Sequence, residues 1–495
     1  MNILYFYAHT QTYTTTVYEH IKSLGEYSSH NIYYISSNQE YEKNVNFNLF
    51  DAIIIHYSIR LPFDQIPERY IYDFQKFNGI KAVFIQDEYD YTKRAWHWIK
   101  ELDISLVFTV VPQDNVQKIY AREEFPGVTF VSVLTGYIPS DISTHIKTPP
   151  SERSLVVGYR GRSLPIRYGK LGQEKVKIGS LVRTYCKAEN IPCDIEWTEE
   201  KRIYNEGWRD FVVSCRAMLG SESGSNVFCW DGDLSRKIDT YKSSHPKVDD
   251  EEIYSKIVSP LEIDGIMNQI SPRAFESIAY RTVLVLFEGV YSGILKPWEH
   301  FIPLKKDGSN LDVVFCLLGD NDFVDSMADR AYKEIIMSGE YSYVQFVKTI
   351  DEELEKLFLT TPNNELNSNK KITNLPLEIT KLPIRYILPI LDSKGVEDKL
   401  QSKVATLKAT ISDALEKKKR RKKELELSLM DHDSNKEDKL NENIIELNAL
   451  ITSYRETLNS TMEELNGLNE EQQSDKKNHK LFRFFRKVRS LSNFR

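Results

Sequence analysis

The sequence has few cysteines and no long apolar segment. It contains five cysteines, an odd number, and no CxxC pair, so we expect neither a disulfide framework nor a structural zinc site, and a reducing, cytosolic compartment. No segment approaches the roughly 18 apolar residues of a membrane-spanning helix. The first residues have neither the basic region nor the long apolar region of a signal peptide, and we expect none.

The sequence also lacks the short motifs of several enzyme classes. It has no HExxH, no GxSxG, no P-loop and no GxGxxG after a strand, so the catalytic and dinucleotide sites that these motifs form are not predicted. Apolar residues make up 41% and charged residues 28%, which is enough for packed cores and argues against wholesale disorder. The net charge is −7, but the C-terminal end is strongly basic, so the remainder is more acidic than this number indicates.

Short apolar runs alternate with amphipathic stretches over residues 1–145. Several runs are continuously apolar, as is typical of parallel strands buried on both faces. We predict an α/β domain with a doubly wound sheet here. The predicted strands are Ile3–Tyr7, Ile32–Ser36, Ala52–His56, Ala82–Gln86, Leu106–Val111 and Thr129–Leu134.

A second α/β series is predicted over residues 151–360, after a proline-containing break near residues 139–150. Both predicted domains are Rossmann-like, with strands separated by helical segments. The predicted strands of the second domain are Leu155–Tyr159, Asp194–Trp197, Ala217–Gly220, Val283–Phe287 and Phe301–Leu304.

The C-terminal part has a different character. Residues 361–395 are polar and proline-interrupted and are predicted to be a linker. Residues 396–472 show apolar residues at alternating steps of three and four, which predicts an α-helical coiled coil, either an intramolecular hairpin or an oligomer. Residues 476–495 place leucine and phenylalanine on one helical face and arginine mostly on the others, as in a helix that lies in an anionic membrane surface. A solvated tail or a protein contact is the alternative.

The strongest local signal is a helix start at Ser271-Pro272-Arg273-Ala-Phe-Glu276. Serine is a good N-cap and proline suits the first helical position, so we expect free N–H groups and the positive end of the helix dipole here. Such an end binds phosphate, and Arg273 adds a fixed positive charge. Glu276, one turn later, can accept two hydrogen bonds from a ribose diol. An ordinary capped helix would show the same residues.

This segment, with the strand Thr-Val-Leu-Val-Leu and the segment Glu-His-Phe-Ile-Pro-Leu-Lys-Lys-Asp that follow it, resembles the C-terminal domain of GT-B glycosyltransferases of the group 1 type. The resemblance covers roughly residues 150–355 and implies that Glu276 binds the nucleotide ribose. Many members have a second glutamate where this chain has Asn268, whose amide can still bond a sugar hydroxyl. They usually have glycine where this chain has Arg281.

Two loops of the second domain are further candidates for donor binding. Arg160 and Arg162 flank Gly161 after a strand, and by resemblance this loop supplies a basic contact to the diphosphate; a basic surface loop is the alternative. Glu222 lies in a small polar loop at the end of another strand, in the crevice where α/β domains bind ligands. It is a substrate-binding candidate or an ordinary turn residue.

Two loops of the first domain are candidates for the acceptor side. His9 follows the first predicted strand, and Asp87 follows the fourth. Either a histidine or a carboxylate can deprotonate an acceptor hydroxyl, so both are catalytic candidates. A turn residue or a helix cap would explain each of them equally well.

We expect no metal or other cofactor. Asp231-Gly-Asp233 is formally a DxD, which holds a divalent cation in the other glycosyltransferase fold, but a lone DxD is common by chance and the two-domain pattern disfavours that fold. The basic diphosphate site therefore predicts a metal-independent enzyme.

The resulting hypothesis is a GT-B glycosyltransferase that moves a sugar from a nucleotide-sugar to a glycan or lipid-linked acceptor. The resemblance suggests a hexosyltransferase of bacterial surface polysaccharide synthesis, peripheral at the cytoplasmic face of the membrane. The tail predicts an anionic membrane surface as a partner, the coiled coil a homo-oligomer, and no nucleic acid is expected because the remaining chain is acidic. A sugar-nucleotide epimerase of the same fold and a non-catalytic scaffold remain alternatives.

Overall fold

The computed structural model describes residues 1–37, 45–139, 142, 148–203, 205–360, 372 and 379–386, with scattered positions between 404 and 462. One compact unit holds Met1–Ile238 and Val248–Ile387, and a second holds Asp239–Lys247 and Leu388–Arg495. Most of the predicted linker, nearly all of the predicted coiled coil and the whole predicted tail lie outside the described residues, and all three stay predictions. Among the helices that are described, none is both long and apolar enough to cross a membrane.

The first sheet has six parallel strands in the order β2-β1-β3-β4-β5-β6. All six predicted strands of this half are confirmed. The side chains of β1, β3, β4 and β5 are buried along their whole length because helices cover both faces of the sheet, which is why these strands are mostly apolar. The side chains of the edge strand β6 are only partly buried. The strands are β1 (Asn2–Tyr7), β2 (Asn31–Ser36), β3 (Ala52–Ile55), β4 (Ile80–Ile85), β5 (Leu106–Thr109) and β6 (Thr129–Ser132).

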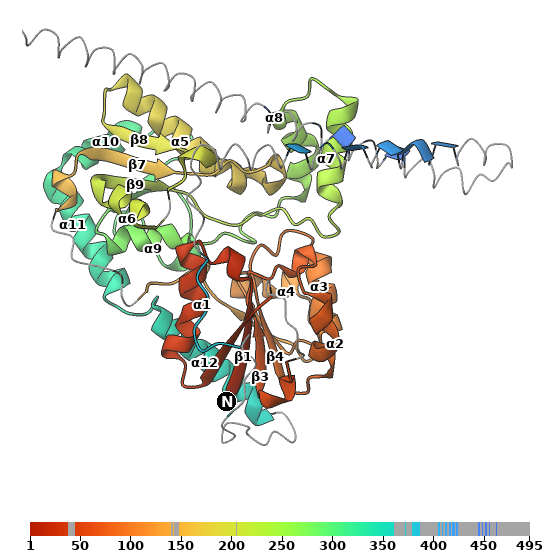
Figure 1. Ribbon diagram of the computed structural model, residues 1–495. Helices are drawn as coiled ribbons and strands as arrows, with labels where there is room; N and C mark the ends of the chain where they lie inside the picture. The colour runs from red at the N-terminus through yellow and green to blue at the C-terminus, as the bar shows by residue number, and fades with distance from the viewer. Residues whose placement is uncertain are drawn as a thin grey trace, which may run out of the picture. The chain divides into compact units, whose positions relative to one another are not determined.

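Helices pack on both faces of this sheet, with α1 and α12 on one side and α2 and α3 on the other (Figure 1). The helix α12 lies in the sequence range that we assign to the second domain, yet its apolar face enters the first core, since Phe346 and Ile350 are buried there. The chain therefore returns to the first sheet after the second sheet is complete, and α12 packs against the first core. The helices are α1 (Thr15–Tyr27), α2 (Glu68–Lys76), α3 (Thr92–Glu101), α4 (Val116–Ile119) and α12 (Tyr343–Thr360).

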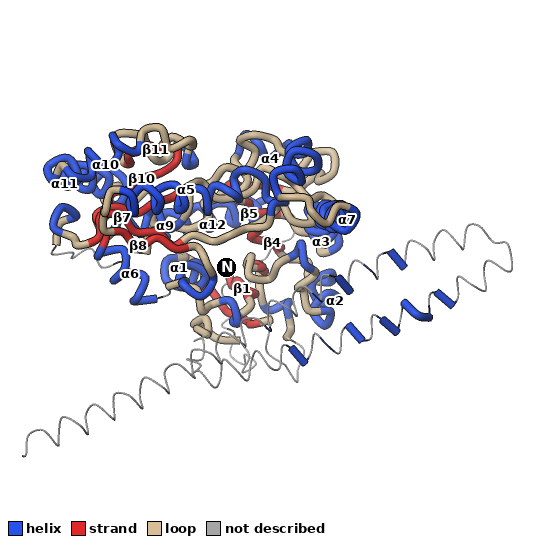
Figure 2. Tube along the Cα trace, turned by 90° about the horizontal axis from the view of Figure 1, so that it is seen from above, coloured by secondary structure: helices blue, strands red, loops and turns tan. Residues whose placement is uncertain are grey.

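The second sheet has five parallel strands in the order β11-β10-β9-β7-β8. All five predicted strands are confirmed, so the chain contains two Rossmann-like domains. Figure 2 shows the strands in red flanked by helices in blue. The strands are β7 (Leu155–Arg160), β8 (Cys193–Glu196), β9 (Cys215–Gly220), β10 (Val283–Phe287) and β11 (Phe301–Leu304).

Two separate apolar cores form on the two faces of the second sheet. One includes side chains of α5, α10 and α11, and the other includes side chains of α6 and α9. The predicted helix start at Pro272 is confirmed, and this helix runs to Ala279. The helix Asn321–Ala331 continues as a π-helical turn, Tyr332–Ile336. The helices are α5 (Gly169–Ala188), α6 (Asn205–Ser214), α7 (Asp233–Ser244), α8 (Asp250–Ile253), α9 (Pro272–Ala279), α10 (Leu311–Gly319) and α11 (Asn321–Ala331).

Each sheet has a point where the strand order reverses. In the first sheet the reversal lies between β1 and β3, and in the second it lies between β7 and β9. Parallel α/β sheets bind ligands outside the carboxyl ends of their strands at such points. Ligand-binding residues are therefore expected in the loops after β1, β3, β7 and β9.

A short segment of residues 379–386, here called the strap, returns to the edge of the first sheet. Thr380 and Tyr34 exchange two backbone hydrogen bonds of 2.8 and 3.0 Å, which extends the edge beyond β2. The backbone N–H of Ile384 donates to the hydroxyl of Tyr7 at 2.7 Å. The strap thus crosses from β2 to the end of β1 and covers an edge that would otherwise be open.

Candidate functional site

A cavity of about 440 Å³ lies in the first compact unit and is lined from both sheets. The first-sheet wall comes from the ends of β3, β4 and β5 and from the start of α1. The second-sheet wall comes from the ends of β7 and β9, from α5 and α6, and from the start of α9. Side chains that line the first-sheet wall include Thr16, Val17, Tyr57, Gln86, Asp87, Tyr89, Val110 and Thr135.

The loop after β9 approaches the cavity through small residues. Ser221, Ser223 and Gly224 line it. Gly224 has φ +99°, and a Cβ atom there would lie 2.1 Å from the backbone oxygen of Met267, so only glycine fits. This close packing holds the polar loop at the strand end that the sequence predicts.

The start of α9 also faces the cavity. Ser271, Pro272, Arg273 and Ala274 all line it, so the positive end of the helix dipole points there. Ser271 occupies the N-cap position, but its hydroxyl makes no capping hydrogen bond. The expected serine cap is therefore absent, and the hydroxyl stands in the cavity wall instead.

Lys175 is a cavity residue that the sequence does not single out. It lies on α5, and its Nζ contacts the hydroxyl of Ser223 at 3.3 Å. Burial, together with the nearby positive charges of Arg273 and Arg162, lowers the pKa of Lys175 to about 8. An anion bound here would interact with a lysine ammonium group that is poorly solvated.

The two arginines of the loop after β7 differ in what they contact. Arg160 is buried and its Nη2 donates to Asp194 at 2.6 Å, with the guanidinium over the ring of Phe211. Its charge is therefore already balanced within the second domain. Arg162 is exposed and lines the cavity, and it has no ion pair within the described residues, so its charge is available to a ligand.

The start of α5 is capped by a side chain from elsewhere in the second domain. The carboxylate of Glu262 accepts a 2.8 Å hydrogen bond from the N–H of Lys170 in the first turn of this helix. Gly169 has φ +66°, and a Cβ there would lie 2.4 Å from the same carboxylate. A protein side chain thus occupies this helix end.

Glu276 lies behind a tryptophan. The indole Nε1 of Trp208 donates to Oε2 of Glu276 at 2.6 Å, and Trp208 lines the cavity whereas Glu276 does not. Burial raises the pKa of Glu276, although the indole hydrogen bond and the charge of Arg273 act in the opposite direction. The predicted ribose carboxylate therefore lies beside the cavity, with its oxygen bonded to an indole.

Glu222 and Asn268 form a supporting network outside the cavity wall. Oε1 of Glu222 accepts from the N–H groups of Val290 and Tyr291 at 3.0 and 2.8 Å, and its Oε2 accepts from Asn268 at 2.6 Å. Asn268 in turn accepts from Asn226. The structure does not bring these two candidates to the cavity; they tie the loops after β9 and β10 together.

Arg281 lies in the turn before β10, at the position where the resembling family usually has glycine. It adopts φ +52°, the left-handed region that glycine fills most easily. Its guanidinium pairs with Asp329 and lies 4.2 Å from the ring centre of Tyr332. These contacts hold an arginine in a conformation that costs it about 1 kcal/mol or more.

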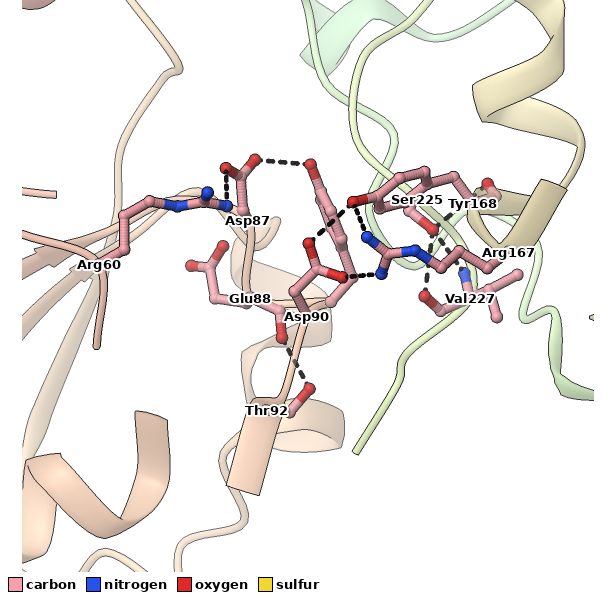
Figure 3. Close-up of polar contacts among 10 residues, drawn as sticks. Arg60, Asp87, Glu88, Asp90, Thr92, Arg167, Tyr168, Ser225 and Val227 are labelled. Carbon is pink, nitrogen blue, oxygen red and sulfur yellow. Dashed lines mark hydrogen bonds and ion pairs between the residues drawn. The ribbon is translucent and has the colours of Figure 1, made fainter. Parts of the chain in front are cut away.

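Asp87 is placed in the first-sheet wall with both carboxylate oxygens bonded (Figure 3). Nη2 of Arg60 donates to Oδ2 at 3.1 Å, and the hydroxyl of Tyr89 donates to Oδ1 at 2.6 Å. Asp87 has φ +61°, an uncommon conformation for a residue with a side chain. Its orientation is therefore fixed by two partners and by the backbone.

The neighbouring carboxyl group, Glu88, is completely buried. Thr109 donates to Oε1 through its hydroxyl, and Val110 through its N–H at 3.2 Å. Oε2 has no partner within the described residues. Burial raises the pKa of Glu88 to about 8, so at neutral pH this group is mostly protonated and supports the loop rather than carrying charge.

Asp90 links the same segment to the second domain. Its carboxylate pairs with Arg167 and accepts from the hydroxyl of Tyr168 at 2.9 Å (Figure 3). Beside it, the N–H of Cys229 donates to the backbone oxygen of Tyr89. The segment after β4 thus supplies both a cavity carboxylate and an anchor for the facing wall.

His9 lies outside the cavity lining. Its Nδ1 is 2.7 Å from the hydroxyl of Ser36, and its ring lies 6.0 Å from that of Tyr386 in the strap. Partial burial lowers the pKa of His9. The loop after β1 is held by the strap, since the hydroxyl of Thr12 accepts from the N–H of Tyr386.

Neither candidate metal pattern lies at the cavity. Asp231 pairs with Lys93 at 3.0 Å and Asp233 with Lys237 at 2.7 Å. Within the described residues, the group with metal-ligating side chains close together is Glu299, His300 and Glu334, with Nε2 of His300 2.9 Å from Glu334. It is not part of the cavity wall.

The cavity therefore presents opposite chemistry on its two walls. The second-sheet wall offers Lys175, Arg162, Arg273 and a helix N-terminus, which suit an anion such as a diphosphate. The first-sheet wall offers Asp87 among tyrosine, glutamine and threonine side chains, which suit a hydroxylated molecule. An anion and a hydroxyl group could meet between them.

No protein-family model matches the sequence, and a search of curated proteins also finds no match. Several solved structures are similar at low sequence identity. An "alpha-glucosyltransferase in complex with UDP and a 13-mer DNA" is 11% identical, covers 72% of this chain and 99% of its own, and gives a TM-score of 0.45. A DNA-modifying β-glucosyltransferase is 13% identical (72% and 100%, TM-score 0.44), and HepE from Anabaena with UDP and glucose is 10% identical (72% and 100%, TM-score 0.42).

Proposed function

We propose that this protein is a GT-B glycosyltransferase that takes a hexose from a nucleotide-sugar and transfers it to a hydroxyl group of a glycan or lipid-linked acceptor. The observation that carries the proposal is the cavity, whose one wall includes Lys175, Arg162, Arg273 and the start of α9 and whose other wall holds an oriented carboxylate, Asp87. The resemblance of the α9 segment to the group 1 type supports it.

In the proposed donor site the diphosphate lies between Lys175, Arg162 and Arg273, against the N-terminus of α9. The cations stabilise the negative charge that develops on the leaving diphosphate. Glu276 takes the ribose hydroxyls. No metal ion is required in this scheme, so transfer is expected to survive EDTA.

In the proposed acceptor site Asp87 accepts a hydrogen bond from the acceptor hydroxyl. Because Arg60 and Tyr89 each use one lone pair of its carboxylate, further lone pairs remain for the acceptor. Asp87 thus orients the hydroxyl and takes its proton as the bond to the sugar forms.

Binding and transfer measurements with purified protein test the proposal. UDP-, GDP-, dTDP- and CMP-sugars are titrated by calorimetry, and transfer is followed with glycan and lipid-linked acceptors. We expect one nucleotide class to bind and Glu276→Ala to weaken it by about ten- to a hundredfold, the effect of losing hydrogen bonds to a charged group. If the protein binds a nucleotide-sugar and epimerises its sugar without transferring it, the protein is the epimerase. If it binds no nucleotide-sugar, the non-catalytic scaffold is the remaining alternative.

We further propose that the protein works in bacterial surface polysaccharide synthesis, at the cytoplasmic face of the membrane, with residues 476–495 on anionic lipid and the coiled coil joining copies. The basis is the segregation of basic and apolar residues in the tail sequence. Deleting residues 476–495 should release the protein from anionic vesicles. Full-length protein that ignores such vesicles at low salt would contradict the membrane role.

A further inference from the structure

Trp208 contacts both charged residues of α9, Arg273 and Glu276. Its Nε1 donates to Glu276 at 2.6 Å, and the guanidinium of Arg273 lies over its ring at 5.0 Å. Its ring also packs near that of Phe211, 5.9 Å away, on the same helix α6. One indole therefore engages a cation and an anion that the proposed function assigns to the donor.

The spacing along α9 explains how one side chain reaches both. Arg273 and Glu276 are three residues apart, so they project from neighbouring positions on one face of the helix. Arg273 and Ser277 line the cavity, as Trp208 does, whereas Glu276 does not. The indole therefore separates the carboxylate of Glu276 from the cavity.

Arg273 has a second protein partner. Its Nη1 donates to the backbone oxygen of Arg160, at the end of β7. The guanidinium of Arg273 is held along the wall by this hydrogen bond and by its position over the ring of Trp208. Arg273 and Glu276, which the proposed function assigns to the nucleotide-sugar, thus both contact other protein groups.

We propose that Trp208 is a plug that the nucleotide must displace from the donor site. The inference rests on the proposed function and adds a gating residue to it. When the nucleotide enters, the indole rotates away, ribose hydroxyls replace its N–H at Glu276, and the diphosphate takes Arg273. The plug gives the buried carboxylate a partner while the site is empty, because an unpaired one would destabilise the fold.

Trp208→Phe tests the plug because it keeps an aromatic ring and removes the N–H. In the nucleotide-free variant, Glu276 then lacks the hydrogen bond from the indole N–H, so the nucleotide no longer has to displace it. We expect its affinity for the bound nucleoside diphosphate to rise about tenfold, the size of one charge-assisted hydrogen bond. Without nucleotide its melting temperature should fall, and saturating nucleotide should restore it.

Trp98→Phe is the matched control. Nε1 of Trp98 also donates to a carboxylate, Asp64, at 2.8 Å, but neither residue lines the cavity. This variant should bind nucleotide as the wild type does. Tryptophan fluorescence gives a second readout: nucleotide should change the emission of the wild type and of Trp98→Phe, but not that of Trp208→Phe.

The outcomes separate the plug from the function on which it rests. Weaker binding by Trp208→Phe would show that the indole is itself a nucleotide ligand, and equal binding with an unchanged fluorescence response would show that it does not move; each overturns the plug and leaves the donor site standing. If neither wild type, Trp208→Phe nor Trp208→Ala binds any nucleotide, the proposed function fails and the plug with it.

Discussion

The two walls of the cavity differ in charge and in how they are built. The second-sheet wall gathers Arg162, Lys175 and Arg273 from three separate elements around the start of α9. The first-sheet wall has one carboxylate, Asp87, which already pairs with Arg60. The proposed function therefore assigns the diphosphate to the wall where cationic side chains gather and the acceptor hydroxyl to the wall with the carboxylate.

The walls also use their sheets differently. The second-sheet wall lies at the reversal point between β7 and β9, as parallel sheets generally arrange it. In the first sheet the lining comes from the ends of β3, β4 and β5, while the end of β1 is held by the strap. The carboxyl end of a strand is therefore not enough to predict a cavity residue, since another segment can occupy it.

The largest expected effect comes from removing the single carboxylate of the first-sheet wall. Asp87→Asn keeps the shape and a hydrogen-bonding oxygen but cannot take a proton, so transfer should fall by about 10²- to 10⁴-fold, the range of general base catalysis. Nucleotide affinity should change little because the cations lie on the other wall. Steady-state transfer and calorimetric binding measure the two quantities separately.

Asp64→Asn provides the control for that variant. Asp64 also has a positive φ, +53°, and pairs with an arginine, Arg94, at 3.1 Å, but it does not line the cavity. It should retain transfer. A similar loss in both variants would mean that the effect is structural and that Asp87 is not the base.

The second prediction removes a cation from the opposite wall. Lys175→Ala should weaken binding of the nucleotide-sugar by about ten- to a hundredfold, because a charge-assisted contact to the diphosphate is lost. Lys177→Ala, on the same helix but exposed, should bind as the wild type does. If Lys175→Ala binds the nucleotide-sugar with unchanged affinity, the diphosphate does not bind beside α5.

The sequence predicts the strands and the start of α9 well, because these depend on local patterns. Continuous apolar runs such as Ile53–Ile55 identify buried parallel strands, and Pro272 marks the first turn of α9. Lys175 carries no such local signal. It becomes a site residue only because folding brings it to Ser223, 48 positions away in the chain.

The same reason explains where the remaining site candidates lie. Glu222 and Asn268 have the residue types of ligand contacts, but their partners are backbone and side-chain groups of other loops, which only the folded chain reveals. Glu262, which caps α5, was not distinguishable from other surface carboxylates in the sequence. Charges that support a site and charges that form it have the same local appearance.

The third prediction concerns pH and follows from the lowered pKa of Lys175, about 8. The protonated form binds the diphosphate, so affinity should be constant below pH 7 and fall as the pH rises through 8, by up to about tenfold at pH 9. A nucleotide-sugar is the suitable ligand because its diphosphate does not titrate in this range. Lys175→Arg should remove the dependence, since arginine keeps its charge.

The smallest expected effect tests where the acceptor binds on the first sheet. His9→Ala removes a hydrogen bond to Ser36 and a ring contact with Tyr386, both outside the cavity. Transfer should change by less than about threefold, which corresponds to roughly 0.5 kcal/mol. The pH profile of the rate should also stay as in the wild type, because a histidine that takes no proton in the reaction leaves no trace in it. A loss of a hundredfold or more, with the acidic limb of the profile abolished, would place the acceptor over the end of β1 and make His9, not Asp87, the residue that receives the proton.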